Sequence, residues 1–503
     1  MLNDVESAVT TPGSEPSAVD RVQVEPVNKR DKRSLYKARV KIFPKRAQGF
    51  FRTLKWRLMA VTLAIYYLTP WIRWDRGPGA PDQAVLIDMP ARRFYFFFVE
   101  IWPQEFFYIA GLLILAGIGL FLLTSTIGRA WCGYACPQTV WVDLFLVVER
   151  AIEGDRAARI RLDQAPWSAG KLGKRLAKHV TWLLIGAATG GAWIFYFADA
   201  PTLASQLVRL EAPPVAWITI GILTATTYVF GGLMREQVCT YMCPWPRIQA
   251  AMLDEDSLVV TYNGWRGEPR ARHQKSMREG AEPVGDCVDC NQCLVVCPMG
   301  IDIRDGQQLE CITCALCIDA CNGVMDRIGR PRGLISYATL KDYNASTREQ
   351  PVHTSLRSVV RPRTVIYTAV WCLVGLGMLY ALLTRDRLDL SVLHDRNPIS
   401  VRLSDGSIRN GYTVKVLNME GAARRFTLRA EGVDGARVTR AGSDAPPAVS
   451  IDIDVPRDDV RVVKLYVSAA AGALSADETP LRFVIGETGG GETAAYDSIF
   501  ARP

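Results

Sequence analysis

Histidine is scarce in this 503-residue chain, and its four copies are far apart: His179, His273, His353 and His394. A haem inside a helical membrane protein needs axial ligands that face one another, so this scatter gives no support for a haem-binding span. The chain also lacks the Gly-x-Gly-x-x-Gly fingerprint of dinucleotide-binding folds. Nothing therefore indicates a bound flavin or nicotinamide cofactor.

Two further absences concern export. No apolar core follows a short basic start, so we expect no cleavable secretory signal peptide. No cysteine follows Cys372, and the thirteen cysteines cluster in metal-ligand patterns. The parts that bear them are therefore expected in a reducing compartment, and any exported part does without disulfides.

The composition predicts a membrane protein with soluble parts. Mean hydropathy is +0.07 although 22% of residues are charged, so apolar residues must be segregated into blocks. The net charge of +8 does not indicate a nucleic-acid partner, because the basic residues gather beside apolar segments. We expect a membrane as partner and no nucleic acid.

Five segments are candidate membrane spans, at residues 58–72, 106–127, 180–197, 215–234 and 364–383. Nine basic residues lie in 129–178 and more follow Arg235, whereas 198–214 has only Arg209. The positive-inside rule then places the N-terminus and the region after the fourth span in the cytoplasm. An odd number of spans places the residues after 383 in the periplasm.

Eight cysteines form two runs of the pattern C-x-x-C-x-x-C-x-x-x-C. This spacing is typical of bacterial two-cluster ferredoxins, in which three cysteines of one run and the last of the other hold each [4Fe–4S] cluster. We expect one cluster on Cys287, Cys290, Cys293 and Cys321, and the other on Cys311, Cys314, Cys317 and Cys297. Zinc sites and disulfides are the alternatives, but the triplet spacing is awkward for one tetrahedral ion.

Two further cysteine pairs follow the second and fourth predicted spans: Cys132 with Cys136, and Cys239 with Cys243. Both read C-x-Tyr-x-C-Pro, and each follows an arginine, Arg129 or Arg235. The repeat predicts two equivalent halves that bring four thiolates together at the cytoplasmic face. In a helical backbone each pair could chelate, and the proline alternatively begins a short surface helix.

A soft site of four thiolates favours Cu(I), iron or zinc. A third iron–sulfur cluster and a reversible dithiol/disulfide couple are compatible with the same residues. Simple packing is the alternative for each pair, and it is the expectation for Cys372, which has no partner in the pattern.

The C-terminal region changes character. Alternating runs at 412–417, 449–455 and 460–467 are separated by Gly, Pro and Asp. Period-two alternation in several short segments predicts strands of an immunoglobulin-like β-sandwich. The region has no cysteine and no evident titratable constellation, so a structural or docking role is expected.

The expected fold is a multi-domain membrane protein: an α-helical transmembrane bundle of about five spans with an inserted two-cluster ferredoxin (α+β) domain and a C-terminal all-β immunoglobulin-like sandwich. Residues 1–57 are predicted to be disordered and then basic and cytoplasmic, and 58–260 to hold spans one to four. The ferredoxin domain is placed at 261–345 in the cytoplasm, the fifth span at 364–383, and the periplasmic β domain at 387–503.

These features together resemble one known family. They include Ile-Trp-Pro-Gln-Glu at 101–105, Gly-Arg-Ala-Trp-Cys-Gly-Tyr-Ala-Cys-Pro-Gln-Thr-Val-Trp at 128–141, the second Cys-Pro motif, the ferredoxin runs and the terminal β domain. In this order the chain resembles the FixG/RdxA/CcoG family of cytochrome c oxidase accessory proteins, which are membrane polyferredoxins. The resemblance covers nearly the whole chain beyond the N-terminal tail.

The resemblance implies a bacterial inner-membrane protein needed to assemble cbb-type cytochrome c oxidase, with reduction of Cu(II) to Cu(I) as its activity. Oxidase subunits or copper chaperones are the implied partners, and the cytoplasmic electron donor stays unknown. The catalytic role, with copper as a further metal, is assigned as a hypothesis to Cys132, Cys136, Cys239 and Cys243. A docking factor without catalysis, and a polyferredoxin that exchanges electrons with quinone, are the alternatives.

Overall fold

The computed structural model describes residues 40–77, 80–271, 284–347, 350, 352, 360–474 and 476–503. The predicted disorder of the first 28 residues, the first part of the basic segment, His273 and His353 lie outside the described residues. The chain divides into two compact units, Met1–Gly375 and Leu376–Pro503, which are described separately.

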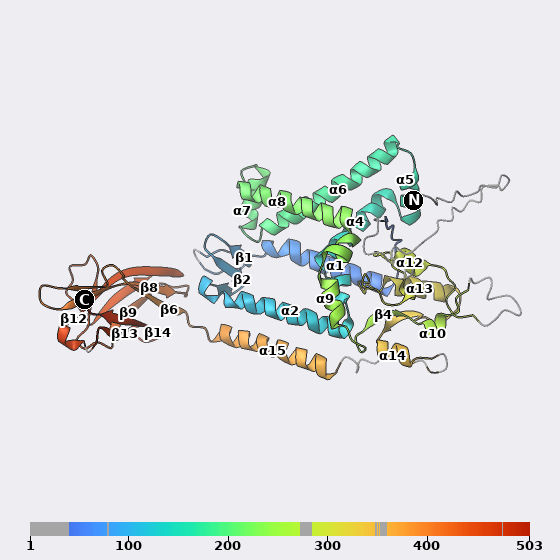
Figure 1. The fold of residues 1–503 in the computed structure, drawn as a ribbon. Helices are drawn as coiled ribbons and strands as arrows, with labels where there is room; N and C mark the ends of the chain where they lie inside the picture. The colour runs from blue at the N-terminus through green and yellow to red at the C-terminus, as the bar shows by residue number, and fades with distance from the viewer. Residues whose placement is uncertain are drawn as a thin grey trace, which may run out of the picture. The chain divides into compact units, whose positions relative to one another are not determined.

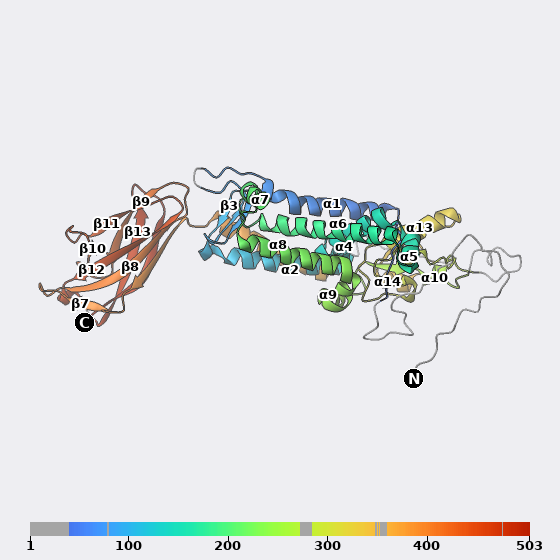
Figure 2. The same ribbon diagram turned by 90° about the horizontal axis from the view of Figure 1, so that it is seen from above.

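Long helices that run alongside one another dominate the first unit (Figures 1 and 2). They are α1 (Phe50–Leu68), α2 (Phe107–Ile127), α6 (Ala169–Ile194), α8 (Pro214–Thr227) with its continuation η4 (Tyr228–Met234), and α15 (Pro362–Leu383). Among the described residues, three helical segments are long and apolar enough to cross a membrane: Pro103–Ile127, Pro214–Met234 and Pro362–Leu383. They coincide with three of the five predicted spans.

The other two predicted spans fall on α1 and α6. Both helices begin with charged turns, which carry Arg52 and Lys55 in α1 and Lys171 and Lys178 in α6. The charge lowers the apolar content of each helix, and membrane crossing by these two helices stays a prediction.

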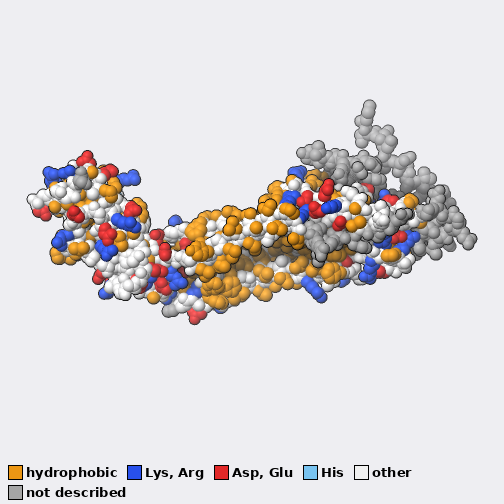
Figure 3. All heavy atoms as spheres, turned by 90° about the horizontal axis from the view of Figure 1, so that it is seen from below, with side chains coloured by type: hydrophobic (Ala, Val, Ile, Leu, Met, Phe, Trp, Pro, Cys, Tyr) orange, Lys and Arg blue, Asp and Glu red, His pale blue; other side chains and the backbone are white. Residues whose placement is uncertain are grey.

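Small residues let the long helices pack closely. A Cβ on Gly190 of α6 would lie 3.0 Å from Ile220 of α8, so the two backbones nearly touch there. Trp371 of α15 donates its indole N–H to the Leu115 carbonyl of α2 over 3.0 Å. Large apolar side chains cover the outer surface of these helices (Figure 3), as expected of a surface that faces lipid.

Shorter elements connect the long helices. They are η2 (Thr69–Trp71), η3 (Pro103–Glu105), α3 (Ala130–Tyr134), α4 (Pro137–Glu153), α5 (Arg156–Gln164), α7 (Ala200–Val208), η5 (Val238–Met242) and α9 (Trp245–Met252). A small antiparallel sheet of β1 (Val85–Asp88), β2 (Arg93–Phe96) and β3 (Val99–Ile101) precedes α2.

The ferredoxin region is closed by two antiparallel strands, β4 (Val259–Tyr262) and β5 (Ile335–Ala338). Between them lie α10 (Gly264–Gly267), α12 (Gln292–Val296), η6 (Ile303–Asp305) and α13 (Leu316–Arg327), and α14 (Leu340–Ala345) follows. Its core joins Val260 and Ile335 of the strands to Ile318 and Met325 of α13. The predicted α+β unit is confirmed.

Asp319 is one of the contacts that hold the ferredoxin region to the helices. The carboxylate of Asp319 in α13 accepts the backbone N–H groups of Phe51 and Arg52 at 3.2 and 2.7 Å. It therefore caps the start of α1, where backbone donors lack partners within the helix and a negative charge is favourable. Gly49 leaves room for this contact, since a Cβ there would lie 2.4 Å from the Asp319 carboxylate.

The second unit is a two-layer β-sandwich, as predicted. One sheet has the order β10-β12-β8-β6 with β7 paired to β8, and the other has the order β11-β9-β13-β14. The strands are β6 (Leu388–His394), β7 (Ser400–Arg402), β8 (Ile408–Asn418), β9 (Arg424–Glu431), β10 (Arg437–Arg440), β11 (Ser450–Val455), β12 (Asp459–Ala469), β13 (Glu478–Glu487) and β14 (Thr493–Ala501), with the short helix η8 (Ala471–Ala473). Tyr412, Phe426, Phe483 and Phe500 are fully buried between the layers.

Candidate metal centres

The two ferredoxin runs have the same local backbone. In each run the residues on either side of the second cysteine have positive φ: Asp289 and Asn291 around Cys290, and Thr313 and Ala315 around Cys314. A short helix then starts, α12 or α13, and carries the third cysteine. Left-handed residues at these matched positions turn each loop around its cysteines, as a ligand loop requires.

The structure groups the eight cysteines in the crossed manner that the spacing predicts. Cys321 interacts electrostatically with Cys290 and Cys287, and Cys293 interacts with Cys290 and Cys321. Cys297 of the first run has the second-run cysteines Cys314 and Cys311 as neighbours. Each predicted set of four is therefore assembled from both runs.

These sites fit iron–sulfur clusters. Four of these cysteines, together with Cys293 of the other predicted set, line one small cavity among apolar side chains: Cys297, Cys311, Cys314 and Cys317. Burial raises the pKa of the Cys297 thiol to about 12, so a bound cation is needed to hold its thiolate. No three Cys, His, Asp or Glu side chains within the described ranges lie close enough to share one metal ion. Single zinc ions, which draw four sulfurs to about 2.3 Å from one metal, fit less well.

The two Cys-Pro motifs also share one backbone design. Cys132 lies in the single-turn helix α3, and Cys136 is an extended residue immediately before Pro137 begins α4. Cys239 lies in the short helix η5, and the extended Cys243 precedes Pro244 and α9. A helix starts at or just after each proline, as predicted, but only α9 is short, with 8 residues against 17 in α4.

The motifs bring their four cysteines into one neighbourhood, although no three of these side chains lie close enough as they stand to share one ion. Burial raises the pKa of the Cys239 thiol to about 12, and the other three motif cysteines act in the same direction as close neighbours. Burial likewise raises the pKa of Cys132 to about 11, against the opposing charge of Arg129. We call Cys132, Cys136, Cys239 and Cys243 the motif quartet. Burial also raises the pKa of Cys136, so the Cys132, Cys136 and Cys239 thiols stay protonated near neutral pH unless a cation binds among them.

The motif quartet lies against the second ferredoxin site. Cys132 and Cys239 pack on the apolar core that contains Cys314 and Ile312. A Cβ on Gly133 would lie 2.7 Å from the Ile312 carbonyl oxygen and 3.0 Å from the Cα of Cys314, so α3 touches the ligand loop. The motif quartet and the second ferredoxin site are therefore in direct packing contact.

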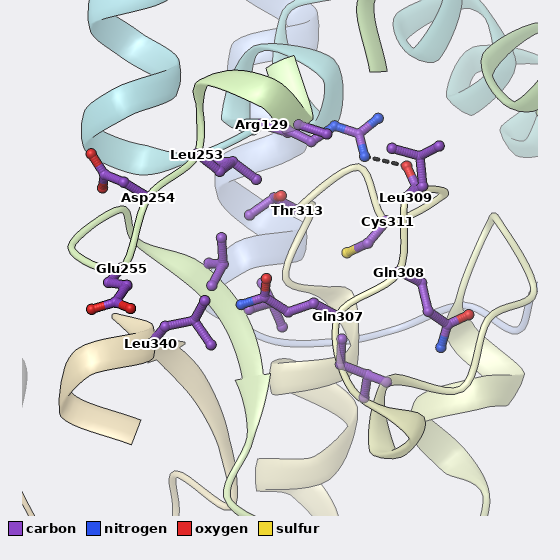
Figure 4. A pocket seen from close by; sticks show the side chains of 14 residues that line it. Arg129, Leu253, Asp254, Glu255, Gln307, Gln308, Leu309, Cys311, Thr313 and Leu340 are labelled. Carbon is purple, nitrogen blue, oxygen red and sulfur yellow. Dashed lines mark hydrogen bonds between the residues drawn. The ribbon is translucent and has the colours of Figure 1, made fainter. Parts of the chain in front are cut away.

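Two polar residues complete this region. Gln249 of α9 is fully buried, and its Oε1 accepts a hydrogen bond from the Cys132 thiol over 3.0 Å. Arg129, also buried, donates to the Leu309 carbonyl and lies with Cys311 on the wall of one cavity (Figure 4). Arg129 stands out in the sequence because it precedes the first Cys-Pro motif, whereas Gln249 carries no motif signal and is not predicted.

Other sequence candidates lie elsewhere. His179 is hydrogen-bonded to Tyr228, and His394 is hydrogen-bonded to Asn410 in the β-sandwich. Cys372 is exposed on α15, so the prediction that it packs inside the protein is wrong. The reason is that this face of the apolar helix is not covered by other described residues.

Three family models match the chain. A 4Fe-4S dicluster domain matches residues 234–340, and a 4Fe-4S binding domain matches residues 109–153. A model described as the Ig-like fold at the C-terminus of FixG, a putative oxidoreductase, matches residues 378–503. The first two models cover the ferredoxin runs and both Cys-Pro motifs.

Full-length relatives match as well. The nitrogen fixation protein FixG of Rhizobium meliloti is 61% identical, over 97% of this chain and 98% of its own length. The proteins RdxA and RdxB of Cereibacter sphaeroides are 54% and 53% identical, each over 93% of this chain and 98% and 97% of their own lengths.

A solved structure covers a smaller share of the chain. The FixG-related protein from Vibrio parahaemolyticus is 23% identical over 23% of this chain and 97% of its own, with a TM-score of 0.20. The identification rests instead on the full-length relatives, the family models and the apolar helices. This chain belongs to the FixG/RdxA family of iron–sulfur electron-transfer proteins and is a membrane protein.

Proposed function

We propose that this protein reduces Cu(II) to Cu(I) at the motif quartet, with electrons supplied through the two ferredoxin sites, during assembly of cbb-type cytochrome c oxidase. One observation carries the proposal. The four cysteines of two motifs more than one hundred residues apart are neighbours, and α3 packs directly on the loop that holds Cys314. A soft thiolate site beside an electron carrier suits reduction of a copper ion.

Bound [4Fe–4S] clusters supply single electrons, and each Cu(II) ion takes one to become Cu(I). The protein's own residues provide the site. Thiolates prefer the soft Cu(I) product over Cu(II), which favours the reduced ion. Gln249 fixes the orientation of the Cys132 thiol, and Thr139 donates to the Cys132 and Cys136 carbonyls at 2.7 and 3.0 Å.

The proposal includes a topology. The ferredoxin region and the motif quartet lie on the cytoplasmic side of the bacterial inner membrane, and the β-sandwich lies in the periplasm. The basic loops support this orientation. Oxidase subunits or copper chaperones are the proposed partners of the β-sandwich. If residues after 383 are deleted, purified protein should keep Cu(II) reduction while oxidase assembly fails.

A third iron–sulfur cluster on the motif quartet is the second candidate. The match of residues 109–153 to a 4Fe-4S binding domain favours it, because that segment contains Cys132 and Cys136. Anaerobic purification with iron analysis and EPR separates the two: about eight irons per chain leave the quartet for copper, and about twelve place a third cluster there.

The activity is tested by replacing all four cysteines of the motif quartet with serine. We expect Cu(II) reduction to be lost while the EPR signals of the two ferredoxin sites remain. Cys372→Ser is the matched control, since this cysteine is exposed on α15, and it should reduce copper at the normal rate. Full activity without the motif quartet would refute the assignment.

A further inference from the structure

Arg129 is a buried cation without a carboxylate partner. Its side chain is only 4% exposed, and none of the described acids forms an ion pair with it. One Nη donates to the backbone carbonyl of Leu309, and Nε has no hydrogen-bond partner. Burial of an unpaired charge is costly, so such a group normally implies a nearby anion.

Two other arginines beside the sulfur sites have carboxylate partners. Arg235 lies four residues before Cys239, much as Arg129 lies three residues before Cys132, and it pairs with Glu149, which Arg159 and Lys178 also contact. Arg304, beside the first ferredoxin site, pairs with Asp302 at 2.6 Å and Asp289 at 2.7 Å. The repeat has therefore kept two arginines but given a carboxylate to only one of them.

The cavity beside Arg129 also contains Asp254 and Glu255, but neither forms an ion pair with it, and Asp254 pairs with Arg361 and Arg363 instead. Thiols are the other ionisable groups near Arg129. It begins the turn that carries Cys132, and it lines the same cavity as Cys311 (Figure 4). Its charge favours the thiolate forms of Cys132, Cys239 and Cys311 against burial. Two of these belong to the motif quartet and one to the second ferredoxin site.

We propose that Arg129 is the shared counter-ion of two negatively charged metal–sulfur centres, one on the motif quartet and one that includes Cys311, and that it raises the reduction potential of both. The inference rests on the redox role proposed for the motif quartet. An added electron makes each centre more negative, and a buried cation nearby stabilises that state more than a solvated one would. Arg129 is thus a positioning residue that acts through the cysteines.

The test is an EPR-monitored redox titration of the purified, iron-loaded protein. Arg129→Gln should lower the equilibrium constant for reduction of the Cys311 centre about tenfold, which is about 59 mV for one electron. The equilibrium constant for reduction should change less than twofold at the other centre, on Cys287, Cys290, Cys293 and Cys321. Arg235→Gln is the matched control. It should change the equilibrium constant for reduction of the Cys311 centre by less than threefold, because Arg235 already has a carboxylate partner in Glu149.

Arg129→Lys keeps the charge and loses the planar fork. Its equilibrium constants for reduction should stay within threefold of those of the natural protein. This variant decides the question if Arg129→Gln fails to retain iron. A tenfold shift in the lysine variant, or unchanged potentials in an iron-replete glutamine variant, would overturn the proposal. Because the Cys311 centre is titrated without copper, failure of the proposed copper reduction is seen separately.

Discussion

The Tyr134 hydroxyl donates a hydrogen bond to the backbone carbonyl of Cys314 over 3.1 Å. Tyr134 is the central residue between the two cysteines of the first Cys-Pro motif, and Cys314 is the second of the four cysteines in the second ferredoxin run. The bond is buried and joins positions 180 residues apart. It holds a motif from one region of the chain in register with the ligand loop of another.

Tyr134→Phe should therefore loosen the contact between α3 and the ligand loop. Leaving the buried carbonyl unpaired should cost about 1–3 kcal/mol of stability, measured by thermal unfolding. Tyr337→Phe is a matched control, since Tyr337 donates to the Thr313 carbonyl of the same loop at 2.8 Å but lies on β5. Both variants should lose stability, and only Tyr134→Phe should slow Cu(II) reduction. Equal rates in both variants would count against a role for this contact in electron delivery.

Gly133→Ala tests the close approach by adding one methyl group. The new Cβ would meet the backbone at Ile312 and Cys314, so α3 or the loop must shift, at a cost of about 1–3 kcal/mol. The EPR line shape of the second ferredoxin site should change with it. Gly173→Ala in α6 meets nothing within 4 Å and should instead stabilise its helix by about 0.5–1 kcal/mol. An unchanged EPR spectrum for Gly133→Ala would contradict the packing described here.

Asp319→Ala should weaken the attachment of the ferredoxin region to α1. Two backbone donors lose their partner, and capping losses are typically about 0.5–2 kcal/mol. Limited proteolysis and thermal unfolding would both report the change. Asp326→Ala on the same helix is the control, because its pair with Arg332 is exposed to solvent and should contribute little to stability.

The buried pair of Asp143 and Arg52 predicts a pH dependence. Burial raises the pKa of Asp143, but Lys55 and Arg52 outweigh it and hold the pKa below its usual range. A carboxylate with a lowered folded-state pKa contributes full stability above its unfolded pKa of about 3.9, and this contribution disappears as the pH falls through the folded value.

Asp143→Asn should therefore cost about 3–5 kcal/mol at pH 7. The same loss is expected at pH 5, and the difference from the natural protein should shrink below about pH 4. Thermal unfolding followed by circular dichroism at several pH values measures this. A difference that grows toward acid would show that the sign of the shift is wrong.

Local patterns predicted the parts of this structure that depend on local spacing. The cysteine runs predicted the crossed grouping because ligand loops must place three sulfurs within one turn of chain. Alternation at 412–417, 449–455 and 460–467 predicted strands, which the structure has as β8, β11 and β12. The proline after each second motif cysteine predicted the starts of two helices.

These local patterns could not predict tertiary contacts. Asp319 caps α1 from 267 residues away, and no spacing rule relates the two positions. Gln249 reads as an ordinary polar residue of a surface helix, yet it is fully buried against Cys132. The sheet β1 to β3 follows the first predicted span, in a stretch whose aromatic content hides its alternation.

The pairing of β4 with β5 has a consequence for how such a protein is put together. Val259 lies opposite Ala338, so the chain enters and leaves the ferredoxin region at adjacent points. The ferredoxin region is thus an inserted module whose two ends are joined by one pair of strands. A module with a different number of sulfur sites could replace it without a change in the distance between α8 and α15. The two ends of the chain that must be rejoined are already neighbours.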